Sequence, residues 1–188
     1  LRDPRLRFLF SPGALSPNLD GTTGADLEHL LHGWLGGADR PITILDLSGV
    51  PVSIINQIVG SLLRILYDAV FWSRRLSEGG RERPLLVVLE EAHAYLNADL
   101  APAAAEAVRR IVKEGRKYGI GAMIISQRPA EIDPTILSQC GTLVALRLGN
   151  ELDRRHVSSA ATDNLEGLFA MLPILRVGEA IVVGEAVN

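Results

Sequence analysis

The chain has 188 residues and a mass of 20.3 kDa, with 47% hydrophobic residues, 22% charged residues and a formal net charge of −3. A high apolar content with so little net charge excludes a chain that is mainly disordered. The single cysteine, Cys140, excludes a disulfide framework and a zinc site built on cysteines. No uninterrupted apolar run approaches the roughly 20 residues of a membrane span. No basic, hydroxylated leader is visible either, so the sequence predicts a cytoplasmic protein with no membrane as partner.

The amino-terminal part of the chain is predicted to hold two strands with a loop and a short helix between them. Arg7–Phe10 has the length and apolar character of a short strand. Residues 11–24 are rich in Gly, Pro and Ser, which is typical of a loop. Asp26–Trp34 has the pattern of a short amphipathic helix. Ile42–Leu47 (ITILDL) is apolar and rich in β-branched residues, which predicts a buried strand.

The central part of the chain is predicted to form a long helix followed by a buried strand. From Val52 to about Leu76, apolar residues recur at spacings of three and four, which favours an amphipathic helix. The polar stretch over residues 77–84 (SEGGRERP) then interrupts the pattern. Leu85–Leu89 (LLVVL) is a continuous apolar run of the kind found in strands covered on both faces.

Helices and strands continue to alternate in the remainder of the chain. An alanine-rich helix is predicted over residues 103–118, with Gly119 as its C-cap. Further strands are predicted at Gly121–Ser126, Thr142–Leu146 and Ala180–Val183, and helix starts at Asp133, Asn150 and Asp163.

This alternation predicts an α/β fold with a mostly parallel sheet and helices on both faces. We expect one unit over residues 1–188, in which residues 11–40 form a loop and short helix inserted ahead of a core over residues 41–188.

Two adjacent carboxylates, Glu90 and Glu91, follow the predicted strand Leu85–Leu89. Ligands of open α/β sheets bind at the carboxyl ends of the strands. A nucleoside triphosphatase uses such a pair, because one carboxylate holds the Mg²⁺ shell and the other orients and deprotonates the attacking water. The alternative interpretation is that both residues merely begin a helix, where the helix dipole favours negative charge.

Arg116 lies in the basic segment Glu114–Gly119 at the end of the predicted helix. Basic residues commonly complement the carboxyl end of a helix, which is the simpler interpretation. The functional interpretation is an arginine finger near a subunit border, which neutralises charge that develops on a γ-phosphate.

Gln127 belongs to the sequence Ser126-Gln127-Arg128-Pro129, which follows the predicted strand Gly121–Ser126. A polar side chain at the carboxyl end of a neighbouring buried strand can reach the γ-phosphate region and report its state. The alternative is a strand that ends in a loop made rigid by proline.

Taken in order, these segments resemble a known family. The stretches that carry the resemblance are LLVVLEEAHAYL, EGRKYGIGAMIISQRPAEIDPTILSQCGTLVALRL and NLEGLFAMLPILRVGEAIVVGEA. They are similar, over about residues 42–187, to the HerA-like branch of the HerA/FtsK superfamily, whose members are hexameric, DNA-translocating ATPases. The resemblance implies a RecA-like P-loop NTPase core, of which this chain is the carboxyl-terminal portion.

The resemblance also implies roles for individual residues. Glu91 matches the catalytic glutamate, and Glu90 matches the Mg²⁺-shell position, where the family usually has aspartate. Arg116 matches the arginine that acts in trans on a neighbour's nucleotide, and Gln127 matches the polar sensor. Bound ATP and Mg²⁺ are therefore expected to contact Glu90, Arg116 and Gln127. The family's GxxxxGK[ST] loop and amino-terminal barrel have no counterpart here, since neither lysine follows a glycine.

The expected function is ATP hydrolysis in a homohexameric ring that drives movement along double-stranded DNA, with a nuclease or an antiviral effector protein as partner. The alternative is a nucleotide-gated oligomeric scaffold for a partner effector enzyme, with little translocation. A metal nuclease built on Glu90, Glu91 and His93 is disfavoured, because it needs further carboxylates near a lysine and neither lysine lies on a suitable strand.

Overall fold

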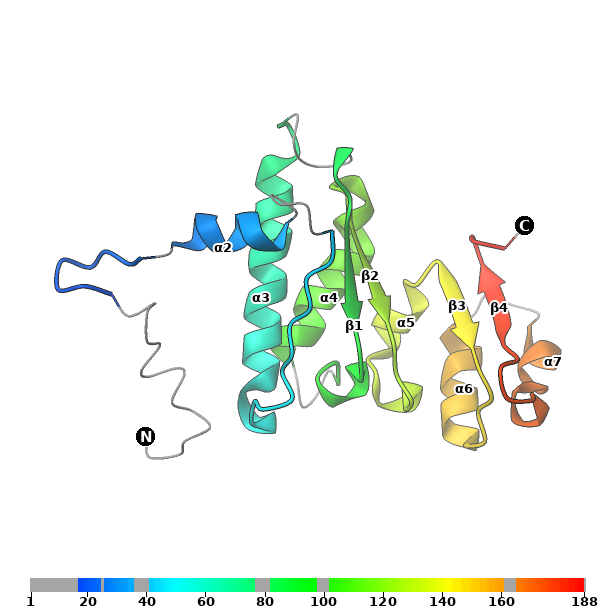
Figure 1. Cartoon of the computed structure of the whole chain (residues 1–188). Helices are drawn as coiled ribbons and strands as arrows, with labels where there is room; N and C mark the ends of the chain where they lie inside the picture. The colour runs from blue at the N-terminus through cyan, green and yellow to red at the C-terminus, as the bar shows by residue number, and fades with distance from the viewer. Residues whose placement is uncertain are drawn as a thin grey trace.

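The structure is a computed structural model that describes residues 17–24, 26–35, 41–76, 82–97, 102–160 and 165–187. Within these ranges the chain has the predicted α/β character, with helices and short strands in alternation (Figure 1). The α-helices are α2 (Leu27–Trp34), α3 (Val52–Ser73), α4 (Pro102–Glu114), α5 (Pro134–Ser138), α6 (Glu151–Ala160) and α7 (Glu166–Phe169). The 3-10 turns are η4 (Ala92–Ala94), η5 (Gly115–Lys117), η6 (Pro129–Glu131) and η7 (Leu172–Ile174). The strands are β1 (Leu85–Leu89), β2 (Ile120–Ile124), β3 (Thr142–Ala145) and β4 (Ile181–Gly184). The strand predicted at Arg7–Phe10 lies outside the described residues.

β1 and β2 are parallel neighbours, with α4 as the crossover between them. Their register runs from Leu85 opposite Ile120 to Leu89 opposite Ile124. β1 has the predicted bounds, and β2 overlaps its prediction with both ends shifted toward the amino terminus. Because the strands are parallel, the chain leaves both at one edge of the sheet, which we call the carboxyl edge. The chain enters both strands at the opposite edge, which we call the amino edge.

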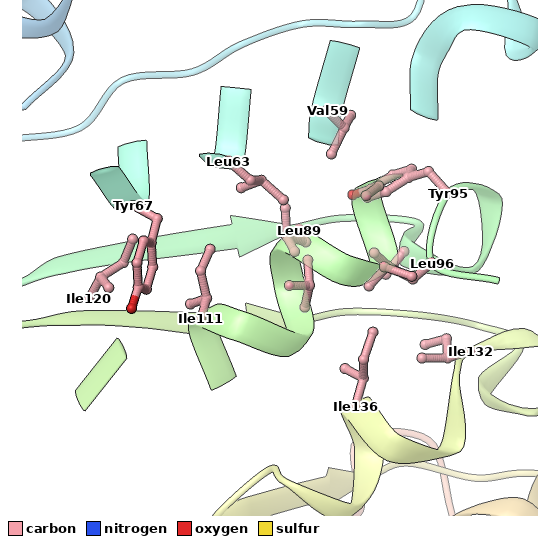
Figure 2. Packing of buried hydrophobic residues seen from close by; sticks show 14 of the residues in the cluster. Val59, Leu63, Tyr67, Leu89, Tyr95, Leu96, Ile111, Ile120, Ile132 and Ile136 are labelled. Atoms are coloured by element: carbon pink, nitrogen blue, oxygen red, sulfur yellow. The ribbon is translucent and has the colours of Figure 1, made fainter. Parts of the chain in front are cut away.

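α3 and α4 pack on one face of the β1–β2 pair and form the main core with it (Figures 1 and 2). One set of alternate strand residues, Leu85, Val87 and Leu89, packs toward these helices. Figure 2 shows how side chains from α3, β1, α4, β2 and the chain near α5 meet in this cluster. The residues labelled there are Val59, Leu63, Tyr67, Leu89, Tyr95, Leu96, Ile111, Ile120, Ile132 and Ile136.

The contact between α3 and α4 depends on a small residue and on a buried polar one. Gly60 of α3 has no space for a Cβ atom, because the backbone of Ala103 lies against it. Close by, the Oδ1 atom of buried Asn56 accepts a 2.9 Å hydrogen bond from the backbone N–H of Ala104. That amide belongs to the first turn of α4 and has no partner within the helix, so Asn56 satisfies it.

Two of the predicted helix boundaries are confirmed by their capping contacts. Gly119 follows η5 with a φ of +85°, the left-handed conformation that a glycine C-cap adopts. Asp133 caps α5, since its Oδ1 atom accepts the N–H of Thr135 at 2.8 Å. α6 begins at Glu151, directly after the predicted Asn150. The predicted start at Asp163 lies outside the described residues.

β3 and β4 form a separate antiparallel pair with its own small core. The buried members of that core are Ala145, Val157, Phe169, Leu172 and Ile181. The expectation of a mostly parallel sheet is therefore wrong for the described residues, which hold one parallel pair and one antiparallel pair. Two helical segments in series, α6 and then α7 with η7, separate these strands. The first segment leads away from the end at which β3 finished and the second leads back to it, so β4 runs in the direction opposite to β3 (Figure 1).

The buried strand predicted at Ile42–Leu47 is not a strand in the structure. Residues 41–47 have no regular secondary structure, and Ile42, Ile44 and Leu45 are exposed. Apolar β-branched residues favour a strand only where a neighbouring strand offers ladder hydrogen bonds and cross-strand contacts. No described strand pairs with this segment.

Helices on both faces of the sheet are likewise not seen within the described part of the chain. On the face opposite α3 and α4, Leu86, Val88 and Met123 remain exposed. The continuous apolar run in β1 predicts cover on both faces. The structure shows cover for one set of its alternating residues only.

One helix, Ser53–Ser73 within α3, is long and apolar enough to cross a membrane by length and composition. A count of uninterrupted apolar runs misses it, because polar residues are spaced along it. Its contacts are those of a core helix, since Val59, Leu63, Tyr67 and Val70 are buried against the rest of the main cluster.

Candidate functional site

The carboxyl edge of the sheet holds both predicted carboxylates, Glu90 and Glu91, immediately after β1. Glu91 adopts a left-handed backbone conformation, with φ 47° and ψ 41°. It is the only non-glycine residue with positive φ in the described part of the chain. Such a conformation costs about 1–2 kcal/mol for a residue with a Cβ atom, and strain of this kind is concentrated at functional sites.

Backbone hydrogen bonds between the two chain segments hold this turn in place. The N–H of Ile125 donates to the carbonyl of Leu89 at 2.9 Å, and the N–H of Ala92 donates to the carbonyl of Ile125 at 3.0 Å. The parallel ladder is thus continued beyond both strands. Glu91 lies between these anchored points, which fixes where its side chain starts.

Gln127 meets Glu91 at this edge, because β1 and β2 are neighbours and both end here. The Nε2 atom of Gln127 donates to the Oε1 atom of Glu91 at 2.7 Å. Both side chains are exposed, and 53% of the Glu91 side chain is open to solvent. The site therefore joins a carboxylate from the end of β1 to an amide from the end of β2, and it is open to a ligand.

His93 and Ser126 also belong to this cluster; sequence reasoning grouped His93 with Glu90 and Glu91 only as a disfavoured metal site and did not pair it with Ser126. The Nδ1 atom of His93 lies 3.4 Å from Oε2 of Glu91 and 3.3 Å from Oγ of Ser126. Ser126 in turn accepts the N–H of Arg128 at 3.0 Å. A search of the sequence for metal-ligand spacing passes over His93, because no second histidine lies at such a spacing from it. The usable signal was its position two residues after a carboxylate in a tight turn.

Tyr95 supports the same turn from beneath. Its hydroxyl donates to the backbone carbonyl of Glu90 at 2.7 Å, and the residue is buried. Burial first, and then the negative charges of Glu90 and Glu91, raise the pKa of Tyr95 to about 12. The hydroxyl therefore keeps its proton over the physiological range and remains a donor.

Two buried aspartates hold the loop that carries Gln127. Asp153 of α6 accepts the N–H of Ala130 at 3.0 Å. Asp133 caps α5 and also lies 3.3 Å from the guanidinium of Arg109, measured from Oδ2 to Nε. These contacts join the loop after β2 to α4 and α6, so the position of Gln127 is linked to the core and to the second pair of strands.

Arg116 lies at the amino edge, away from Glu91, because η5 directly precedes β2. The structure therefore does not bring Arg116 together with the other predicted site residues. Its side chain is 91% exposed, and it lies 3.5 Å from the carboxylate of Glu185, which is itself exposed. An ion pair between such exposed groups contributes little and is easily exchanged for another partner.

The residues at the carboxyl edge can bind Mg²⁺ only together with waters and the phosphates of a nucleotide, as nucleotide sites do. Among the described residues, no group of three or more His, Cys, Asp and Glu side chains could enclose a metal ion. Mg²⁺ at phosphate sites keeps several waters and takes one or two carboxylates together with substrate phosphates. The exposed carboxylate of Glu90, next to Glu91, can supply such a ligand.

A parallel β-α-β unit with carboxylates and an amide at its carboxyl edge is the arrangement of α/β proteins that bind ligands at strand ends. The family profile described as "Helicase HerA-like C-terminal" matches residues 59–185. The chain belongs to this family.

The relatives that match the chain carry names that agree with this assignment. A probable helicase of Methanocaldococcus jannaschii is 42% identical over 105 residues, which are 56% of this chain and 20% of that protein. The DNA double-strand break repair helicase HerA of Sulfolobus acidocaldarius is 34% identical over 147 residues, which are 78% of this chain and 30% of that protein. HerA of Saccharolobus solfataricus is 31% identical over 147 residues, covering 78% of this chain and 29% of that protein. The matched segment thus spans less than a third of the length of these relatives.

Proposed function

We propose that this chain is the carboxyl-terminal part of the RecA-like ATPase motor of a DNA translocase. The observation that carries the proposal is the 2.7 Å hydrogen bond between Gln127 and Glu91, which joins the ends of two parallel strands at one exposed point. Membership of the HerA-like family supports it, since the relatives are named as helicases.

Glu91 acts as the general base in this proposal. A carboxylate offers about four acceptor positions, so the bonds to Gln127 and the contact with His93 leave room for a water. That water attacks the γ-phosphorus and passes its proton to Glu91, while the bond from phosphorus to the ADP oxygen breaks and ADP leaves. Gln127 donates through its amide nitrogen to Glu91, and its side-chain carbonyl can accept from the same water. The pair therefore orients the nucleophile from two sides.

Glu90 would hold Mg²⁺, directly or through a water, beside the phosphates. When bound there, Mg²⁺ neutralises negative charge on the transferred phosphoryl group. A GxxxxGK[ST] loop is not found among the 188 residues. The phosphates would accordingly be held by a part of the protein outside them, which agrees with the small share of each relative that the chain matches.

Arg116 would act in trans, across the border of a homohexameric ring. The two edges of the sheet carry opposite charge, which supports contact between the amino edge of one subunit and the carboxyl edge of the next. Near the amino edge the charged residues are Arg83, Lys113, Arg116 and Lys117 against Glu82, Glu114 and Glu185. Near the carboxyl edge they are Glu90, Glu91 and Glu131 against Arg128. In such a contact the guanidinium of Arg116 leaves Glu185 and meets the neighbour's γ-phosphate.

The ring would move along double-stranded DNA in the cytoplasm, with a nuclease or an antiviral effector as partner. The alternative, a nucleotide-gated scaffold for an effector enzyme, uses the same site but has no need of DNA. The response of the ATP hydrolysis rate to DNA distinguishes the two functions, because a translocase couples hydrolysis to movement along DNA and a scaffold does not.

The test measures ATP hydrolysis by the complete protein and by Glu91→Gln, each with and without double-stranded DNA. We expect Glu91→Gln to bind ATP but to hydrolyse it at least about 10²-fold more slowly, in line with losses of a general base. Glu106→Gln, an exposed glutamate on α4, is the matched control and should remain active. Normal turnover by Glu91→Gln would remove the residue from the mechanism. Turnover that is indifferent to DNA would favour the scaffold.

A further inference from the structure

His93 is a titratable side chain that faces Glu91 at the carboxyl edge and that the proposed mechanism does not use. It lies in η4, two residues after Glu91, and only 19% of its side chain is exposed. Its Nδ1 atom lies between two oxygens, 3.3 Å from Oγ of Ser126 and 3.4 Å from Oε2 of Glu91. A surface histidine without a role has no reason to direct one ring nitrogen at two such atoms.

The carboxylate beside Nδ1 favours the tautomer in which that nitrogen carries the ring proton. If Nδ1 carried no proton, its lone pair would face the negatively charged carboxylate of Glu91. With the proton on Nδ1, the ring donates toward both oxygens. Ser126 accepts the N–H of Arg128 through the same Oγ atom. The histidine is thus tied to the loop that carries Gln127.

The two oxygens of Glu91 are consequently held from two different elements. Gln127, from the loop after β2, donates to Oε1 at 2.7 Å, and His93, from η4, faces Oε2. The distance of 3.4 Å is longer than a good hydrogen bond. Contacts of this kind often tighten only when the ligand is bound. A carboxylate held at both oxygens can present its remaining acceptor positions in one direction only.

We propose that His93 is a positioning residue that orients the carboxylate of Glu91 through its Nδ1–H group and is itself oriented by Ser126. The inference rests on the proposed role of Glu91 as general base. It assigns to His93 no contact with the nucleotide. Its effect should therefore fall on the rate of the chemical step and leave the binding of ATP unchanged.

Three substitutions of His93 in the complete protein test this assignment. The amide nitrogen of asparagine stands about where Nδ1 stands in histidine, whereas that of glutamine stands about where Nε2 stands. We expect His93→Ala to lower kcat by about 10- to 100-fold, since a misplacement of about 1 Å can cost on the order of 10²-fold. The KM for ATP should not change, because no ground-state contact is lost. His93→Asn should recover most of the activity, and His93→Gln should not.

The order of the three variants distinguishes positioning from folding. If His93 served only to pack the turn, Asn and Gln would fail together with Ala, and thermal melting temperatures would fall in parallel. That result overturns the proposal, and so does full activity in all three variants. Even if His93→Ala does not fold, the comparison of Asn with Gln still decides.

A double-mutant cycle with Ser126→Ala tests the second half of the proposal. Ser126→Ala alone should lower kcat by less than His93→Ala, and in the His93→Ala background it should lower kcat by less than it does alone. Loss of the acceptor for the N–H of Arg128 occurs in both backgrounds, so the cycle cancels it. Strictly additive effects would show that Ser126 does not act through His93.

Glu91→Gln, measured beside these variants, separates this inference from the proposed function. If Glu91→Gln is inactive and His93→Ala is fully active, only the positioning role is wrong. If Glu91→Gln hydrolyses ATP normally, the proposed general base is wrong, whatever the His93 variants do.

Discussion

The two edges of the β1–β2 pair differ in how their functional residues are held. At the carboxyl edge, Glu91 has a fixed and strained backbone, and partners from two elements face its side chain. At the amino edge, Arg116 is almost fully exposed and meets one exposed carboxylate. The first arrangement is organised within one chain before any ligand binds. The second presents a charged group to something outside the chain. The comparison indicates which part of the chemistry a single subunit can supply and which part needs a neighbour.

The largest expected effect comes from removing the side chain presented at the amino edge. Arginine fingers contribute about 10³–10⁵-fold to rate, so Arg116→Ala should give assembled rings that bind ATP and barely hydrolyse it. Lys117→Ala is the matched control, because Lys117 is the next residue, is also exposed and is also basic. ATPase assays on both variants, with ring assembly followed by sedimentation, make the measurement. Equal losses in the two variants would point to general charge at this edge and not to a finger.

Mixing subunits tests whether the two edges cooperate between chains. Rings of Arg116→Ala and Glu91→Gln subunits contain some interfaces that pair an intact Glu91 with an intact Arg116. Activity should partly return in such rings, although neither variant is active alone. If mixed rings demonstrably form and no activity returns, the assignment in trans is wrong.

Because the backbone of Glu91 is strained, we expect glycine at this position to be better tolerated by the fold than alanine, although both remove the carboxylate that hydrolysis needs. Glu91→Ala and Glu91→Gly remove the same carboxylate, but only glycine adopts positive φ without strain. We expect the glycine variant to be about 1 kcal/mol more stable than the alanine variant, which is about 2–4 °C in Tm for a chain of this size. Thermal melts of the two variants make the comparison, and both should be inactive.

The control for this prediction is the same pair of substitutions at Glu106, an exposed position within α4. There the sign should reverse, because glycine inside a helix costs about 1 kcal/mol relative to alanine. If the glycine variant were less stable than the alanine variant at both positions, the presence of a Cβ atom at position 91 would cause no backbone strain.

Much of the carboxyl edge was predictable because it follows from local sequence. The apolar run Leu85–Leu89 must be a strand or part of a buried helix, and its length and the polar breaker before it favour a strand. Once the two strands are assigned as parallel, Glu91 and Gln127 are expected at the same edge of the sheet, and the pairing of β1 with β2 brings them into contact. The same reasoning places Arg116 at the opposite edge. The capping role of Asp133 is equally local.

The features that were missed depend on atoms brought together by the tertiary structure. No periodicity predicts the left-handed backbone of Glu91, because that conformation is imposed by hydrogen bonds to Ile125 on either side of it. The partnership of His93 with Ser126 joins residues far apart in the sequence. The segment Ile42–Leu47 failed as a strand for the opposite reason. Its local propensity is strong, and the ladder that would use it is not formed by any described strand.

The smallest expected effect compares two tyrosines, one near each edge, at alkaline pH. The hydroxyl of Tyr95 donates to the carbonyl of Glu90, and burial and then the two carboxylates raise the pKa of Tyr95 to about 12, from a usual value of 10.0. Tyr67 lies toward the amino edge, where its hydroxyl donates to Glu114 at 3.3 Å. Burial raises the pKa of Tyr67, the positive charge of Arg110 opposes the rise, and the negative charge of Glu114 adds to it.

A raised pKa in the folded state means that the folded chain keeps a proton which the unfolded chain has already lost. The contribution of Tyr95 to the free energy of unfolding should therefore be complete below about pH 10 and decline as the pH rises toward 12.

Tyr95→Phe should be about 1 kcal/mol less stable than the wild type at neutral pH, through loss of one hydrogen bond. That difference should shrink between about pH 10 and 12, since phenylalanine does not titrate. For Tyr67→Phe the difference should shrink less, because the positive charge of Arg110 offsets the negative charge of Glu114 beside this hydroxyl. Urea unfolding at a series of pH values measures both, and other groups that titrate in this range cancel because all three proteins share them. If the difference in the free energy of unfolding between wild type and Tyr95→Phe stays constant across this range, the folded chain does not raise the pKa of Tyr95.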